Sequence, residues 1–216
     1  MIHLYAIVRG LAALPVRAGM GGAQLDARAV DDVVAVTSIL SDEPEPADGA
    51  VAHGLVVEAL VDVADAVVPV RYGARFPDAA ALVATVSGQL PALRERLASV
   101  EGCVELSVRL LASDDAPTVA TDGTAYMQER LHAVRATEQL ADALHEPLAR
   151  RARASVRHRR LDRAVVHDGC YLVERQRTDA FRALVEAFGT DHPEVTVVCT
   201  GPWAPYNFAV APERAA

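Results

Sequence analysis

The sequence contains no lysine, few aromatic residues and an excess of acidic over basic side chains. All 21 basic residues of the 216-residue chain are arginine, and 29 acidic residues give a formal net charge of −8. We expect no nucleic acid partner, because an acidic chain is repelled by the phosphate backbone. A glycine-rich stretch contains Gly19, Gly21 and Gly22. It cannot be a phosphate-binding loop of the type that ends in Gly-Lys-Ser/Thr, since that loop requires a lysine.

Thiol, metal and nucleophile motifs are also missing. Cys103, Cys170 and Cys199 are widely spaced and odd in number, which argues against a disulfide framework and is typical of a reducing cytoplasm. The histidines and cysteines form no C-x-x-C, H-x-x-x-H or H-E-x-x-H pattern, so we expect no metal site. There is no Gly-x-Ser-x-Gly nucleophile elbow. We therefore predict no catalytic residues and no cofactor.

No hydrophobic run is long enough for a membrane span. The longest apolar stretch, at 54–70, is interrupted by Glu58, Asp62 and Asp65, and these charges exclude it as a transmembrane helix. The N-terminal segment lacks the basic region of a signal peptide. The sequence therefore favours a cytoplasmic protein without a membrane partner.

The first half of the chain alternates strand and helix patterns. A strand is predicted at 2–8, and two strand-like runs flank Asp31-Asp32, a plausible tight hairpin turn. Apolar residues recur every three or four positions at 51–66, which predicts a helix with one buried face. Another helix should begin at Asp78 as its N-cap, and Pro91 should kink it or divide it in two.

The second half predicts the order strand, helix, strand, strand, helix, strand, beginning at Cys103. This βαββαβ order is that of a ferredoxin-like unit. A polar segment at 113–122 has no periodicity and is the best linker candidate. We predict an α+β protein of two domains, 1–112 and 123–216, the second ferredoxin-like with an antiparallel sheet and packed helices. The strand at 103–111 could belong to either domain.

The run His167-Asp168-Gly169-Cys170 places an imidazole, a carboxylate and a thiol side by side. A nucleophile and its base are normally brought together by the fold rather than by adjacency in sequence. Asp-Gly between two apolar runs is also a strong hairpin signal. We therefore predict a β-turn at Asp168-Gly169 instead of a catalytic site.

Seven arginines lie between 150 and 163. The first three close a long predicted helix, where positive charge faces the negative end of the helix dipole. No aromatic residues interleave with the arginines, as they would in a single-strand nucleic acid site. A solvated face or an acidic protein partner is the better interpretation.

Aromatic residues concentrate in two proline-flanked segments. One segment, at 200–208, is predicted to be extended and non-helical, because Gly201 and Pro202 should end the strand before it. The other segment lies at 69–77. Two interpretations remain open for both: the rings seal the core, or they form a surface for an apolar partner. The candidate partner-binding residues are Arg71, Tyr72, Phe76, Trp203, Pro205, Tyr206 and Phe208.

Six stretches in order along the chain resemble the gas vesicle protein GvpL/GvpF family: LYAIVRG, PVRYGARFPDAAAL, VELSVRLL, GTAYMQERL, CYLVERQRTDAFRALVEAF and TGPWAPYNF. Tyr72 and Ala74-Arg75 stand where the family more often has Phe and small or β-branched residues, and Asn207 replaces a frequent Ser.

The resemblance implies a two-domain α+β protein without catalytic residues that helps to build the gas vesicle. It also implies an assembly factor or minor structural component that contacts the hydrophobic main shell protein and possibly other gas vesicle proteins. Two alternatives stay open from the residues. One is a ferredoxin-like regulatory module that binds a small ligand, and the other is a cofactor-free enzyme of the dimeric α+β barrel type.

Overall fold

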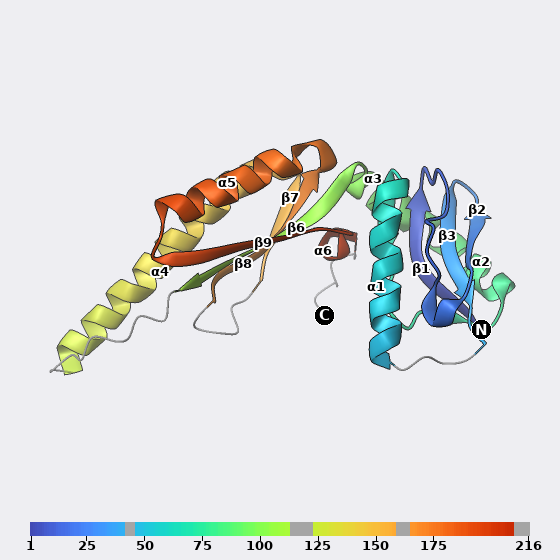
Figure 1. The fold of residues 1–216 in the computed structure, drawn as a ribbon, viewed down its shortest axis with the longest axis horizontal. Coiled ribbons are helices and arrows are strands. Elements are labelled where there is room, and N and C mark those ends of the chain that lie inside the picture. The colour runs from blue at the N-terminus through green and yellow to red at the C-terminus, as the bar shows by residue number, and fades with distance from the viewer. Residues whose placement is uncertain (42–45, 113–122, 159–164, 210–216) are drawn as a thin grey trace. The chain divides into compact units, whose positions relative to one another are not determined.

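The computed structural model describes residues 1–41, 46–112, 123–158 and 165–209 (Figure 1). Contacts divide the chain into two compact units. The first unit comprises Met1–Val104 together with Trp203–Ala216, and the second comprises Glu105–Pro202. Both units combine helices with antiparallel strand pairs. The predicted α+β class is therefore confirmed.

The sheet of the first unit is built around its first strand. It consists of β1 (Ile2–Arg9), β2 (Leu25–Val30), β3 (Val33–Ile39), β4 (Ala66–Pro69) and β5 (Arg75–Phe76). The strand order is β2-β3-β1-β4, with β5 also paired to β1, and all pairs are antiparallel. Every β1 residue before the last is buried, as expected for a central strand covered on both faces.

Three helices cover this sheet. Helix α1 (Pro46–Val63) places Val56 and Leu60 in one core cluster with Tyr5 of β1. Helices α2 (Ala79–Gly88) and α3 (Leu90–Val100) replace the single kinked helix that Pro91 could have produced. The Asp78 carboxylate accepts a 2.8 Å hydrogen bond from the Ala81 amide, which confirms the predicted N-cap. The predicted hairpin at Asp31-Asp32 is also present between β2 and β3.

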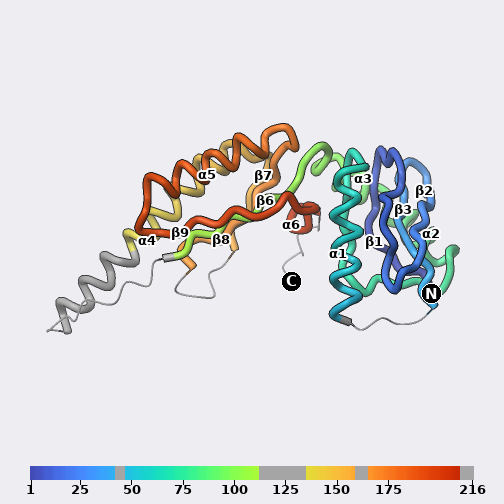
Figure 2. Tube along the Cα trace, in the orientation of Figure 1, coloured from blue at the N-terminus to red at the C-terminus, as the bar shows by residue number. Residues whose placement is uncertain are grey.

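The second unit has the predicted βαββαβ order. Its elements are β6 (Cys103–Ala112), α4 (Gly123–Arg151), β7 (Ala154–Arg157), β8 (Val165–Glu174), α5 (Thr178–Asp191) and β9 (Val195–Trp203). The strand order β7-β8-β6-β9 puts the first strand inside the sheet, as in a ferredoxin-like unit. Helices α4 and α5 lie together on one face (Figure 1), and α5 runs beside β9 (Figure 2). Their apolar sides form one core with β6 and β8.

The units divide at different places from the expected domain boundary, and the segment 113–122 itself lies outside the described residues. The divisions fall between Val104 and Glu105 and again between Pro202 and Trp203. Strand β6 pairs with β8 and β9, so most of it belongs with the second unit. The C-terminal segment returns to the first unit, where Ala204 and Ala209 are buried.

Two local predictions are wrong. Asp168 and Gly169 form no turn, because β8 runs straight through them and Gly169 pairs with Arg157 of β7. A glycine is needed there for space: a Cβ atom at position 169 would lie 2.7 Å from His167 Nε2. The segment after Thr200 is not wholly extended either. Strand β9 continues to Trp203, and Tyr206–Ala209 forms the short helix α6.

Candidate functional site

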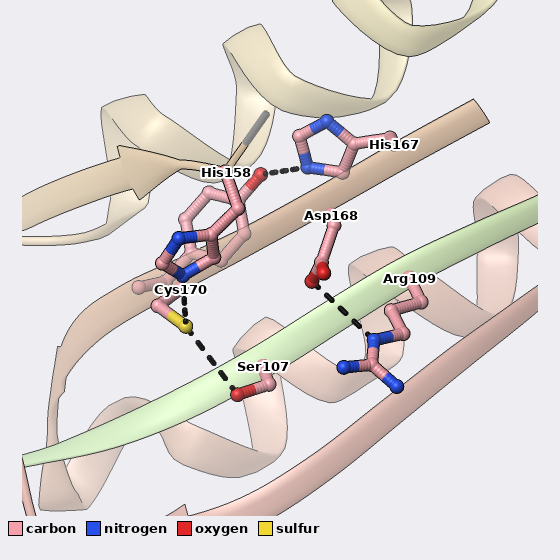
Figure 3. Close-up of polar contacts among 7 residues, drawn as sticks. Ser107, Arg109, His158, His167, Asp168 and Cys170 are labelled. Carbon is pink, nitrogen blue, oxygen red and sulfur yellow. Dashed lines mark hydrogen bonds and ion pairs between the residues drawn. The ribbon is translucent and has the colours of Figure 1, made fainter. Parts of the chain in front are cut away.

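The thiol of Cys170 in β8 has two polar neighbours, one from β6 and one directly after β7. Its Sγ atom lies 3.3 Å from His158 Nε2 and 3.5 Å from Ser107 Oγ (Figure 3). This pairing of thiol and imidazole is the feature that would suggest nucleophilic chemistry. However, burial raises the pKa of Cys170 to about 11. A reactive cysteine requires a lowered pKa, so this thiol has the character of a structural one.

The next residue of β8 faces a different cluster, since successive side chains of a strand point to opposite faces. The Tyr171 hydroxyl lies 2.9 Å from His167 Nε2 and 2.9 Å from His145 Nδ1. Burial lowers the pKa of both histidines, that of His167 to about 4. The hydroxyl therefore bridges two neutral rings by hydrogen bonds. This arrangement ties α4 to β8 at the centre of the second unit.

The first unit contains a comparable cluster. His53 Nε2 lies 2.8 Å from the carbonyl oxygen of Val70, and His53 Nδ1 lies 2.8 Å from His3 Nε2. A carbonyl oxygen can only accept, so His53 donates through Nε2 and accepts from His3 through Nδ1. His3 Nδ1 is left as a buried lone pair without a hydrogen-bond partner. Burial, with His53 and Arg75 nearby, lowers the pKa of His3 to about 4.

The glycine-rich stretch contacts Tyr5, which packs against the histidine cluster of the first unit. Tyr5 packs edge-on against His3, and its hydroxyl accepts a 2.8 Å hydrogen bond from the Met20 amide. A Cβ atom at Gly19 would lie 2.5 Å from the same hydroxyl. Within the described residues, no group of three or more His, Cys, Asp or Glu side chains is placed to hold a metal ion.

The two aromatic segments singled out in the sequence converge in the first unit. Tyr72, from the first half of the chain, and Tyr206, from near the C-terminus, pack against the same core cluster. Pro205 is buried and Phe208 is half-buried. Burial raises the pKa of Tyr206 to about 12. Tyr72 and Tyr206 therefore contribute to the core of the first unit, and the role of the candidate residues in partner binding stays a prediction.

The remaining candidates are more accessible. Trp203 is 39% exposed, and Arg71 is exposed. Arg71 and Phe76 line a groove of about 300 Å³, whose floor includes Leu4 and Ile7. The sequence missed the opposite wall, which α2 and α3 supply: Thr85, Val86, Gln89, Leu93 and Arg96. The groove thus has an apolar floor and two arginines at its edge, which suits an apolar segment of a partner.

Comparison with known proteins identifies the relatives of the chain. The family described as gas vesicle synthesis protein GvpL/GvpF matches residues 1–210. Gas vesicle protein F2 of Halobacterium salinarum is 34% identical over 177 residues, covering 80% of this chain and 74% of that protein. Gas vesicle protein L of Streptomyces sp. strain CB03234 is 31% identical over 247 residues, covering 96% of this chain and 92% of that protein.

Solved structures agree in fold. The crystal structure of GvpF from Anabaena sp. PCC7120 superposes with a TM-score of 0.83 at 14% identity, covering 100% of this chain and 98% of that one. The crystal structure of GvpF from Microcystis aeruginosa gives a TM-score of 0.81 at 15% identity, covering 97% of this chain and 99% of that one. None of the described helices is both long and apolar enough to cross a membrane. The family match and the relatives above 30% identity show that this chain belongs to the gas vesicle protein GvpL/GvpF family.

Proposed function

We propose that the chain is a non-enzymatic assembly factor or minor structural component of the gas vesicle that contacts the hydrophobic main shell protein. The observation that carries this proposal is the groove of the first unit. Its floor is apolar, and its two sides come from the β4–β5 region and from α2 and α3. A groove of this kind can shield an apolar segment that would otherwise aggregate.

The state of the titratable groups supports a binding role over catalysis. The pKa of Cys170 is raised, and the pKa values of His3 and His167 are lowered, in each case chiefly by burial. Each of these shifts favours the uncharged form of the side chain. The three groups are held as neutral parts of the two cores rather than poised for proton transfer or attack.

Co-expression with the main shell protein tests the proposal. The wild-type chain should raise the soluble fraction of the shell protein and co-purify with it. Thr85→Trp should reduce co-purification about tenfold, because Thr85 is an exposed groove residue and a ring at that position obstructs the groove. Ser87→Trp is the matched control, since Ser87 is exposed on the same helix and does not line the groove.

The co-expression experiment distinguishes a wrong function from a wrong binding site. If the wild-type chain changes neither the solubility nor the recovery of the shell protein, the proposed function is wrong. If both tryptophan variants retain full co-purification, the contact exists but the groove is not its site. Circular dichroism of the two purified variants confirms that each remains folded.

A further inference from the structure

Strand β9 differs from the other edge strands among the described residues. Strand β2 carries Asp26 and Arg28, β4 has four residues and ends in Pro69, and β7 has four residues and ends in Arg157. Charges, prolines and short length are the devices by which proteins prevent unwanted strand pairing. Strand β9 has nine residues, VTVVCTGPW, and none of them is charged. Its one proline, Pro202, lies near its end, so the six residues 195–200 carry neither a charge nor a proline.

The side chains of β9 alternate regularly in exposure. Val195, Val197 and Cys199 are half-buried and pack against the core of the second unit. Thr196, Val198 and Thr200 are exposed, Val198 to 39%. Because β9 is last in the order β7-β8-β6-β9, no described strand follows it at that edge. The uncharged and regularly alternating part of β9, residues 195–200, is therefore suited to pairing with another strand.

A groove lies directly beside this strand. Helix α5 runs along β9 in both views (Figures 1 and 2), and a cavity of about 490 Å³ opens between them. Its lining comprises Arg182, Val185, Glu186, Gly189, Thr190, Val197 and Cys199. A Cβ atom at Gly189 would lie 3.6 Å from Val197 Cγ2, so the glycine leaves room where helix and strand are close.

The charges of the groove indicate which segment it accepts. Arg182 and Glu186 carry opposite charge, so the lining as a whole is neutral. Arg182 also donates a hydrogen bond to the Gly201 carbonyl oxygen, which uses part of its capacity within the unit. A charged partner segment would gain little at such a site and would lose its hydration. An uncharged segment complements both the strand and the groove.

We propose that β9 is a strand-addition site for an extended, uncharged segment of apolar and β-branched residues from a partner protein. The segment pairs with the backbone of β9, and alternate side chains enter the groove between α5 and β9. Under the function proposed above, the segment belongs to the main shell protein. Only that identification rests on the proposed function, because the site itself is argued from β9 and α5.

A blocked peptide of alternating threonine and valine, six residues long, tests the site without the shell protein. Hydrogen exchange on the full chain should show at least fivefold slower exchange at 195–201 when the peptide is present. Gly189→Leu should abolish this protection, since the new side chain fills the groove. Gly54→Leu is the matched control: it also lies in a helix, and a Cβ atom there meets nothing within 4 Å.

Val198→Lys provides a second variant that leaves the core intact, because Val198 is already partly exposed. It introduces a charge of the kind that prevents strand pairing at other sheet edges. It should therefore reduce the slowing of hydrogen exchange by the peptide at least fivefold. Unchanged exchange at 195–201 with the peptide overturns the proposal. Protection that rises with protein concentration in the absence of peptide, together with dimers in sedimentation, also overturns it, because the occupant is then a second copy.

The shell protein gives an independent comparison. If it co-purifies with the chain while Gly189→Leu and Val198→Lys both retain full recovery, the proposed function stands and the β9 site is wrong for that partner. If the peptide protects β9 but the shell protein does not co-purify, the site stands and the proposed function is wrong.

Discussion

In the first unit helices cover both faces of the sheet, whereas in the second unit no described strand lies beyond the edge strand β9. The central strand β1 is buried by α1 on one side and faces the groove residues of α2 and α3 on the other. In the second unit, α4 and α5 build the core, but the outward residues of β9 remain exposed. The two units therefore offer different surfaces: a groove between elements in the first, and a strand edge in the second.

The units are alike in one respect, because each holds a buried histidine next to a tyrosine. His3 and Tyr5 lie in the first unit, and His167 and Tyr171 lie in the second. Both histidines are 2% exposed or less. Protonation of either histidine would place a charge in a buried site, which destabilises the folded state. The comparison therefore predicts similar responses to acid but separate responses to core mutations.

Core truncation should have the largest effect. Leu60 of α1 and Leu144 of α4 are each 1% exposed or less, and replacing either by alanine should cost about 2–5 kcal/mol. If the units unfold separately, Leu60→Ala should lower only the hydrogen-exchange protection of the first unit. Leu144→Ala should lower only the exchange protection of the second unit.

This prediction is contradicted if Leu60→Ala and Leu144→Ala each destabilise both units equally. If each variant lowers both readouts equally, the two units unfold as one cooperative block. The comparison would then describe two regions of a single domain. Circular dichroism at the same temperatures follows the total loss of structure and serves as the common reference.

Acid should produce the next effect. The unfolded chain protonates histidine near pH 6.5, whereas His3 and His167 in the folded chain remain neutral down to about pH 4, because burial lowers the pKa of each. The unfolded state thus binds more protons between these values. The free energy of unfolding therefore falls as the pH drops from 6.5 to 4, by up to roughly 3 kcal/mol for each histidine.

Replacing one histidine at a time shows how much of this fall in the free energy of unfolding each of them causes. His3→Gln should reduce the pH dependence of the first unit and leave that of the second, and His167→Gln should do the reverse. Part of the slope remains in each unit, because burial also lowers the pKa of His53 and of His145. Denaturant unfolding at pH 7 and pH 4.5 measures both slopes, so a lower starting stability of either variant does not affect the test. A slope that stays unchanged in both variants would show that other groups cause the acid sensitivity.

Local features of the fold were predictable from the sequence, because their causes lie within a few residues. The Asp78 cap and the break between α2 and α3 follow from a carboxylate and a proline at fixed positions. The turn expected at Asp168-Gly169 is absent, because the glycine is needed for packing. A Cβ atom at position 169 would occupy the space of the His167 ring. This steric requirement depends on the strand pairing, and no local sequence pattern indicates it.

The candidate surfaces depend on contacts between distant segments. The sequence marked Arg71 and Phe76, but the opposite wall of their groove comes from α2 and α3 and carries ordinary helix residues. The uncharged run of β9 is visible in the sequence, yet its position at an edge follows only from the strand order. The return of the C-terminal segment to the first unit was likewise out of reach of local patterns.

The smallest predicted effect compares how one helix of each unit begins. Asp78 caps α2 through the Ala81 amide, whereas α5 has no side-chain cap and has Asp179 in its first turn. Asp78→Ala should destabilise the first unit by about 1 kcal/mol, because a direct hydrogen bond is lost. Asp179→Ala removes only a charge near the helix dipole and should cost the second unit about 0.3–1 kcal/mol, less at high salt. Denaturant unfolding at 0.05 and 0.5 M salt separates the two, since the loss at Asp78 should persist at both. Equal losses that vanish together in salt would mean that Asp78 also acts mainly through its charge.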